Sequence, residues 1–209
     1  MRIAVIGAGN VGGGLAAAKA HHNVVVSAAD PSSAAKTAET AGATAAASNA
    51  EAVQGADAVV LAVPHGAVAQ VVADLGGALD GRTVVDATNP LNDSYTDLTT
   101  SGTSATEALQ QQVPGANVVK ALNTVFASRY AAPTEDGQPL AALIAGDDAD
   151  AKATVAQLVE SLGLRPVDAG GLRMARSLEE IAFLNISLNA ANGWPWQSHF
   201  ALVGPTTTA

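Results

Sequence analysis

The chain has 209 residues, enough for one ordinary domain, or one domain with a small appendage, built around a single core. It contains no cysteine, which excludes disulfide scaffolds, zinc ribbons and thiol chemistry. Its formal net charge of −9 disfavours nucleic acid and anionic membranes as partners, because both are themselves negatively charged.

The chain begins with an apolar run of strand length rather than with the longer apolar stretch of a signal peptide. It also lacks a run of about 18 apolar residues that would cross a bilayer. We therefore expect a cytoplasmic protein with a small-molecule substrate.

Short β-branched runs alternate with alanine-rich stretches as far as about residue 168, which is typical of βαβ units on a parallel sheet. The predicted strands are residues 2–6, 23–27, 43–46, 58–63, 83–86, 117–120, 140–145 and 164–168. The predicted helices between them are residues 11–20, 33–41, 67–75, 104–112 and 148–162. The sequence thus predicts an α/β protein with a Rossmann-type, doubly wound and mainly parallel sheet.

A glycine-rich loop follows the first predicted strand and opens the first predicted helix. It consists of Gly7, Ala8, Gly9, Asn10, Val11 and Gly12. In this context the first glycine permits a tight turn, the second lets a diphosphate approach the backbone, and the third lets the helix pack closely on the strand. We therefore predict that these residues bind the diphosphate of NAD or NADP at the helix N-terminus.

The end of the second predicted strand bears on the choice between NAD and NADP. An acidic residue there binds ribose hydroxyls, whereas an arginine binds the 2′-phosphate. This chain has Ala28, Ala29 and Asp30, with no basic residue from there until Lys36. We expect these three residues to contact the cofactor. Because Asp30 precedes a proline, a turn residue at the head of the next helix is an equal alternative, and the cofactor stays NADP or NAD.

Three further strand ends should face the same crevice, because open α/β sheets bind ligands at the carboxyl ends of their strands. They contribute Val63, Pro64, His65, Asn89, Asn123 and Thr124. The first three are expected along the cofactor, with His65 as a wall residue rather than a proton donor. The other three are polar groups predicted to converge on a nicotinamide, and their alternative role is to cap their own backbone turns.

The loop of residues 89–103 is long and polar, and loops of that length in compact domains are usually functional. We expect it to form a lid or a wall of the substrate site.

After residue 169 the pattern changes to one helix, predicted over residues 172–191, and an aromatic tail with Trp194, Trp196 and Phe200. We divide the chain into a dinucleotide-binding Rossmann domain, residues 1–169, and a C-terminal segment, residues 170–209. This segment either packs on the sheet or on a second subunit, or completes the substrate cleft.

Several catalytic patterns are missing from the sequence. No histidine pair has zinc-ligand spacing, and neither a nucleophile elbow nor a Walker loop occurs. We therefore predict no metal, and no catalytic residue is assigned.

Four segments, in order and spacing, resemble the NADP oxidoreductases that depend on the deazaflavin coenzyme F420. They are RIAVIGAGNVGGGLA, DATNPL, VVKALNTVFASRYA and GDDADAKATVAQLVESLGLRPVDAGGL. The resemblance covers essentially the whole chain. It implies hydride transfer between NADPH and coenzyme F420 as co-substrate, with the two rings against each other at the carboxyl edge of the sheet, usually in a homodimer.

Carried over residue by residue, the resemblance gives these positions specific roles. The loop Ala8 to Val11 and the strand-four contact Val63-Pro64-His65 would hold the cofactor. The residues near both rings would be Asn123, Thr124, Val125 and Phe126. Ala28 and Ala29 stand where archaeal members of the family have Ser-Arg for the 2′-phosphate. The anionic tail of F420 would need basic partners, and the few available are Arg129, Arg173 and Arg176.

Two other functions fit the same fold. In the first alternative, the hydride acceptor is another flavin or a small carbonyl or imine compound. Imine and pyrroline carboxylate reductases, however, add a helical C-terminal domain that is larger than the C-terminal segment of this chain. In the other, the chain is a non-catalytic NAD(P) sensor that reports redox state to a partner.

Overall fold

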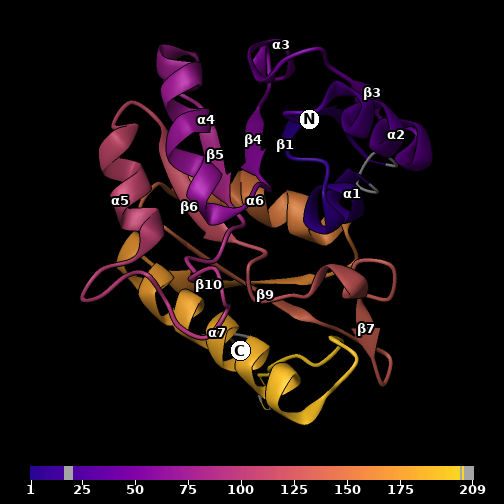
Figure 1. Ribbon diagram of the computed structural model, residues 1–209, viewed down its shortest axis with the longest axis vertical. Helices are drawn as coiled ribbons and strands as arrows, with labels where there is room; N and C mark the ends of the chain where they lie inside the picture. Colours follow the sequence, from indigo (N-terminus) through magenta and orange to yellow (C-terminus); the bar gives the residue numbers. More distant parts are fainter. Residues whose placement is uncertain (17–20, 203, 205–209) are drawn as a thin grey trace.

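The structure is a computed structural model that describes residues 1–16, 21–202 and 204, and a mixed β-sheet forms its centre (Figure 1). The eight strands lie in the order β3-β2-β1-β4-β5-β6-β9-β10. Their bounds are β1 Arg2–Ile6, β2 Asn23–Ser27, β3 Thr44–Ala45, β4 Ala58–Leu61, β5 Thr83–Asp86, β6 Asn117–Ala121, β9 Ala141–Gly146 and β10 Arg165–Gly170. The first six strands pair in parallel, in the order expected of a doubly wound dinucleotide-binding sheet.

The last two strands run the other way. β9 pairs antiparallel with β6, and β10 pairs in parallel with β9. The connection from β6 to β9 contains a small hairpin, β7 Thr134–Glu135 and β8 Gln138–Pro139, and no crossover α-helix. A parallel neighbour needs such a crossover, so the chain returns antiparallel. The mainly parallel sheet is confirmed, but the expectation that parallel βαβ units continue to residue 168 is wrong.

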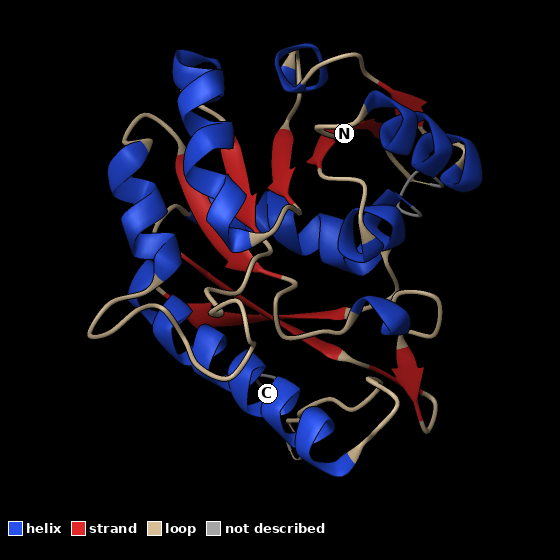
Figure 2. Ribbon diagram, viewed as in Figure 1, coloured by secondary structure: helices blue, strands red, loops and turns tan. Residues whose placement is uncertain are grey.

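Helices cover both faces of the sheet (Figure 2). Their bounds are α1 Asn10–Ala16, α2 Pro31–Ala41, α3 Asn49–Val53, α4 Val68–Leu75, α5 Ala105–Gln112, α6 Ala149–Ser161 and α7 Ala175–Asn192. Side chains alternate along each strand, so Val5 lies in one hydrophobic core and Ile6 in the other. The first core includes Leu15 of α1 and Val155 of α6, and the second includes Val72 of α4.

Local signals account for the helix ends that the sequence predicts. Ser104 and Glu107 form a capping box at α5, since the Ser104 hydroxyl accepts from the Glu107 amide and the Glu107 carboxylate accepts from the Ser104 amide. Asp148 accepts from the Ala151 amide at 2.8 Å and caps α6. The short helix α3 was not predicted, because five residues are too few for a periodic pattern. Residues 17–20 of the predicted helix 11–20 lie outside the described residues.

The C-terminal helix α7 follows a 3-10 turn, Leu172–Met174, and ends where Gly193 adopts a left-handed backbone with a φ of 64°. It contacts α5 and β9, and in Figure 1 it lies beside β9 and β10. In this place α7 closes one side of the crevice at the carboxyl edge of the parallel strands. None of the helices in the described part of the chain is both long and apolar enough to cross a bilayer.

Candidate active site

The glycine loop between β1 and α1 is closed tightly at its two ends and open in the middle. A Cβ on Gly7 would overlap the carbonyl oxygen of Ala62, and a Cβ on Gly12 would overlap the carbonyl oxygen of Gly7. At Gly9, by contrast, no heavy atom lies within 4 Å of the Cβ position. The first and third glycines are therefore needed for the turn and for packing, and the second leaves its backbone accessible to a ligand.

Asp30 caps helix α2. Its carboxylate accepts hydrogen bonds from the amides of Ser32 and Ser33, at 3.1 and 3.2 Å, and from their hydroxyls, at 2.7 and 2.6 Å. These bonds, that of the Ser33 hydroxyl first, lower the pKa of Asp30 to about 2. The turn role expected as the alternative is thus observed, while the ribose contact stays a prediction. Ala28 and Ala29 bring no polar side chain to this strand end.

A cavity of about 790 Å³ opens at the carboxyl ends of β4 and β5, beside α7. It brings together the predicted residues Val11, Val63, Pro64, His65, Asn89 and Phe126. Further wall residues are Leu91, Asn92, Asp93 and Tyr95 of the long polar loop, and Ile186 and Trp196 of the C-terminal segment. The loop of residues 89–103 and the C-terminal segment therefore both contribute to this cavity.

A side chamber of about 100 Å³ adjoins the large cavity. The two share the lining residues Val11, Ala87, Asn89, Phe126 and Ile186. The side chamber adds Asn123, Thr124 and Val125, so the predicted substrate-binding segment lies beside the crevice. Other predicted cofactor residues, such as Gly9 and Asp30, line neither of the two, and Ala8 lines a third cavity between α1 and α2.

Asn89 and Asn123 pair with each other across two strand ends. The Asn89 Nδ2 donates to the Asn123 carbonyl oxygen at 3.2 Å, and the Asn123 Nδ2 donates to Asn89 Oδ1 at 3.0 Å. A second bond from Asn123 Nδ2 reaches the carbonyl oxygen of Leu178 on α7, also at 3.0 Å. The two asparagines thus join segments far apart in the sequence, and their alternative role as caps of their own turns is wrong.

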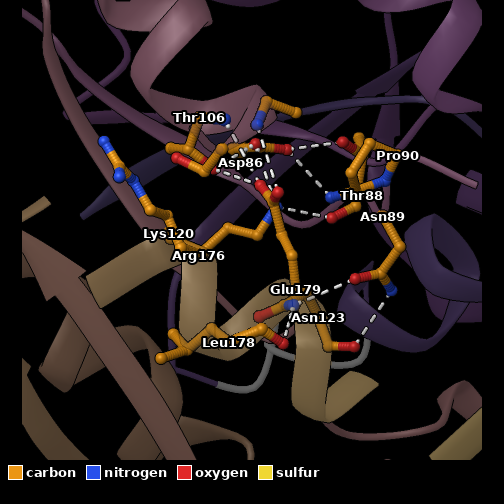
Figure 3. A network of polar contacts seen from close by, with 12 residues as sticks. Asp86, Thr88, Asn89, Pro90, Thr106, Lys120, Asn123, Arg176, Leu178 and Glu179 are labelled. Atoms are coloured by element: carbon orange, nitrogen blue, oxygen red, sulfur yellow. Dashed lines mark hydrogen bonds and ion pairs between the residues drawn. The ribbon is translucent and has the colours of Figure 1, made fainter. Parts of the chain in front are cut away.

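Next to this pair lies a buried ionic cluster that was not predicted from the sequence (Figure 3). The Lys120 Nζ lies 3.1 Å from Asp86 Oδ2 and 3.2 Å from Glu179 Oε1, and it donates to the Thr88 carbonyl oxygen at 2.6 Å. All three charged side chains are almost fully buried. Burial by itself would raise the pKa of Asp86, but the Lys120 charge and hydrogen bonds from Thr88 and Thr106 together lower it.

Glu179 connects this cluster to a second helix. Its carboxylate accepts from the amides of Ala105 and Thr106, at 3.1 and 3.3 Å, in the first turn of α5. The cluster therefore joins α7, α5 and the ends of β5 and β6, and it fixes the turn that carries Asn89. One sequence feature could have indicated this cluster. Two apolar strands carry a charged residue near their ends, Asp86 in β5 and Lys120 in β6, and these two residues pair in register.

Two of the three arginines considered for an anionic ligand are engaged within the protein. Arg129 is buried and donates to the carbonyl oxygens of residues 132, 134 and 197, and it pairs with Glu135 at 2.9 Å. Arg176 contacts both carboxylate oxygens of Glu107, at 2.7 and 2.8 Å. The Arg176 hydrogen bond is the main reason that the pKa of Glu107 falls to about 2. Arg173 is exposed.

No three His, Asp or Glu side chains in residues 1–16, 21–202 and 204 gather closely enough to hold a metal ion. The large cavity is lined by one imidazole, that of His65, and one carboxylate, that of Asp93. Its walls otherwise consist of apolar, tyrosine, threonine and asparagine side chains, an arrangement suited to holding flat rings rather than to acid–base chemistry.

Comparisons with known proteins place this geometry in context. The family profile described as NADP oxidoreductase, coenzyme F420-dependent, matches residues 2–90. An F420-dependent NADP reductase from Methanothermobacter thermautotrophicus is 34% identical over 92% of this chain and 90% of its own length. Its counterpart from Methanothermobacter marburgensis is 32% identical over 70% of this chain and 68% of its own length.

Solved structures are similar over the same extent. A crystal structure from Arthrobacter sp. fb24, provisionally described as an F420-dependent NADP-reductase, has a TM-score of 0.84 and 32% identity. The match covers 97% of this chain and 100% of that chain. The similarity thus includes the C-terminal helix as well as the sheet.

Proposed function

This chain belongs to the NADP oxidoreductase family that depends on coenzyme F420, and we propose that it transfers a hydride between NAD(P)H and the deazaflavin ring of F420. The observation that carries the proposal is the cavity of about 790 Å³, which extends from Val11 at the glycine loop to Ile186 on α7. It lies at the carboxyl edge of the sheet, where open α/β sheets bind their ligands. Relatives named for this reaction match most of the chain.

The residues present fit a dinucleotide. The space above Gly9 leaves room for a diphosphate, while Gly7 and Gly12 hold the turn. The diphosphate would be held by Gly7, Ala8, Gly9, Asn10, Val11 and Gly12. The nicotinamide half would lie along Val63, Pro64, His65 and Asn89, and the adenosine ribose near Ala28, Ala29 and Asp30.

When bound, the dihydronicotinamide would supply the hydride and the deazaflavin would accept it, with one proton from solvent completing the balance. The chain's own residues orient the rings and exclude water. Val11, Phe126 and Ile186 provide apolar walls, and Asn123 to Phe126 would lie near both rings. Direct hydride transfer between two bound rings would need positioning of the rings more than an acid or a base.

The choice between NADP and NAD depends on the start of α2. The relatives are named for NADP. In this chain the carboxylate of Asp30 lies at that helix end, with alanines at positions 28 and 29 and no guanidinium beside them. A carboxylate there favours ribose hydroxyls over a 2′-phosphate, so we propose that NADH is accepted together with NADPH.

A second candidate keeps the hydride chemistry and changes the acceptor. Arg129 and Arg176 already donate to carbonyl or carboxylate oxygens of the protein, and Arg173 is the exposed member of the three. An acceptor with a long anionic tail gains little from arginines that are already paired. This favours, as the alternative, a flavin or a small carbonyl compound without such a tail.

The test is to follow oxidation of NADPH and NADH separately, with F420, FMN and FAD as acceptors. We expect turnover with F420 and little with the flavins. Turnover with FMN or FAD alone would support the second candidate. Micromolar dinucleotide binding without turnover on F420, FMN or FAD would refute the proposed F420 reaction and would favour a redox sensor or a reductase of a small carbonyl compound.

We also propose a division into a Rossmann domain, residues 1–169, and a C-terminal segment, residues 170–209, in a cytoplasmic homodimer. Support for the dimer comes from exposed apolar side chains on and after α7, such as Leu184 at 50% and Phe200 at 45% exposure. Light scattering of the purified chain tests the dimer, and a Leu184→Glu variant should be monomeric if α7 forms the contact.

A further inference from the structure

Two neighbouring residues after β6 each carry a buried polar atom without a hydrogen-bond partner in the described part of the chain. The atoms are Asn123 Oδ1 and Thr124 Oγ1. Asn123 is only 7% exposed. Folded proteins pair nearly all buried polar atoms, so two unpaired atoms on adjacent residues call for a specific explanation.

The orientation of the Asn123 side chain is fixed by its donors. Its NH2 group has two hydrogens, and these are used by Asn89 Oδ1 and the Leu178 carbonyl oxygen, each at 3.0 Å (Figure 3). A flipped amide would place an oxygen against both acceptors and lose both bonds. Asn123 Oδ1 therefore points away from Asn89 and Leu178 and remains an acceptor without a donor.

Both residues line the side chamber of about 100 Å³ that adjoins the large cavity. Most of its other lining is apolar, including Val11 and Ile186. A flat ring fits the larger cavity, and only a small substituent fits the chamber. A fixed carbonyl acceptor next to a hydroxyl is complementary to an amide, which offers an N–H donor beside a carbonyl acceptor.

We propose that Asn123 and Thr124 form an amide-binding subsite and that the carboxamide of the nicotinamide ring occupies it. Asn123 Oδ1 accepts from the carboxamide NH2, and the Thr124 hydroxyl donates to the carboxamide oxygen. This assignment rests on the proposed function. The pyrimidine edge of a deazaflavin carries the same amide chemistry. The chamber is lined by Val11, however, which belongs to the glycine loop predicted to hold the dinucleotide, and this favours the nicotinamide as the occupant.

The experiment measures dissociation constants by calorimetry, without turnover. The probes are NADP⁺, its 3-acetylpyridine analogue, in which a methyl group replaces the NH2, and 2′,5′-ADP, which lacks the ring. The variants are Asn123→Ala, Thr124→Val and, as a matched surface control, Thr154→Val on α6, whose hydroxyl bonds within its own helix.

Each variant has its own expected pattern. Asn123→Ala should weaken NADP⁺ binding about 5- to 10-fold, the value of one hydrogen bond, and leave the acetylpyridine analogue unchanged. Thr124→Val should weaken both, because both retain the carbonyl, and Thr124→Ser should restore them. No variant should change 2′,5′-ADP binding, and Thr154→Val should change nothing.

Equal effects of Asn123→Ala on NADP⁺ and on the analogue would overturn the assignment. So would unchanged NADP⁺ binding together with weaker F420 binding, which would place the deazaflavin in the chamber. If Asn123→Ala fails to fold, the wild-type chain still tests the subsite. It should bind NADP⁺ about 10-fold more tightly than the analogue, the value of one hydrogen bond, and equal affinities would refute the subsite. Absence of any dinucleotide binding would refute the proposed function instead.

Discussion

Replacing Lys120 with methionine removes the charge that joins the C-terminal helix to the sheet and keeps much of the side-chain length. In the native chain, Nζ lies within 3.2 Å of both Asp86 and Glu179 and donates to the Thr88 carbonyl oxygen. The variant leaves two carboxylates and one carbonyl oxygen buried without their cation. We expect the attachment of α7 to weaken more than any surface change could cause.

The expected size of this effect follows from burial. Removing one partner of a buried ion pair typically costs about 3 to 5 kcal/mol, because an uncompensated charge remains inside. A domain of this size has a free energy of unfolding of roughly 5 to 15 kcal/mol, so the loss is a large fraction of the total. The Lys152–Asp168 pair, whose side chains are 20% and 61% exposed, provides the contrast. Breaking such a surface pair costs about 0 to 1 kcal/mol.

The assay is urea unfolding followed by far-UV circular dichroism, with Lys120→Met and Lys152→Met compared at equal protein concentration. Both variants remove one lysine from one Lys–Asp pair, so net charge is matched. We expect the midpoint to fall strongly for Lys120→Met and little for Lys152→Met, with similar slopes. Losses that agree within about 1 kcal/mol would refute the argument that burial of the cluster determines its effect.

The pH dependence of the free energy of unfolding should have opposite signs in the native chain and in the Lys120→Met variant. In the native chain the pKa of Asp86 is lowered, so its contribution is present above the unfolded value and is lost as pH falls through the folded value. In the Lys120→Met chain the burial of Asp86 is no longer opposed by a cation, which raises the pKa of this carboxyl. The variant should therefore gain stability as pH falls, and the difference between the two proteins should shrink from about pH 7 to about pH 5.

Three further predictions concern single positions. Gly9→Ala should keep the thermal midpoint and weaken NADP⁺ binding at least about 10-fold, because its Cβ enters the open space over the loop. Gly12→Ala should instead lower the thermal midpoint, because its Cβ clashes with a backbone carbonyl. Similar thermal midpoints for the two variants would contradict this. Asp30→Arg should raise NADPH affinity, and unchanged NADH binding in Asp30→Ala would show that Asp30 only caps its helix. Glu107→Gln should flatten the fall in thermal midpoint between about pH 5 and about pH 3, because the Arg176 bond lowers the Glu107 pKa from 4.5 to about 2 and stability is lost as this carboxylate protonates.

The parallel half of the sheet was predictable from local sequence. β1, β2 and β5 have the bounds that the sequence predicted, because strands covered on both faces read as short runs of β-branched residues. The glycine loop was equally predictable, since Gly7 and Gly12 each lie so close to a backbone carbonyl that neither position tolerates a side chain. Strand ends at one edge then brought Val63, Asn89 and Phe126 to one cavity.

Other features depend on contacts that no local pattern encodes. The apolar run that forms β9 does not by itself indicate the direction of the strand, which follows from the connection without a crossover helix and from the pairing with β6. Glu179 reaches Lys120 from 59 positions further along the chain, on a helix whose periodicity reveals no such partner.

The sequence by itself determined the dinucleotide-binding sheet, the glycine loop and the set of strand-end residues, because short-range sterics and alternation of apolar residues specify them. Only the tertiary structure decided that Asn123 is held by Asn89 and Leu178, and that α7 is attached by a buried charge. The physical reason is that a buried polar group is stable only with partners of the right geometry, and here those partners come from distant parts of the chain.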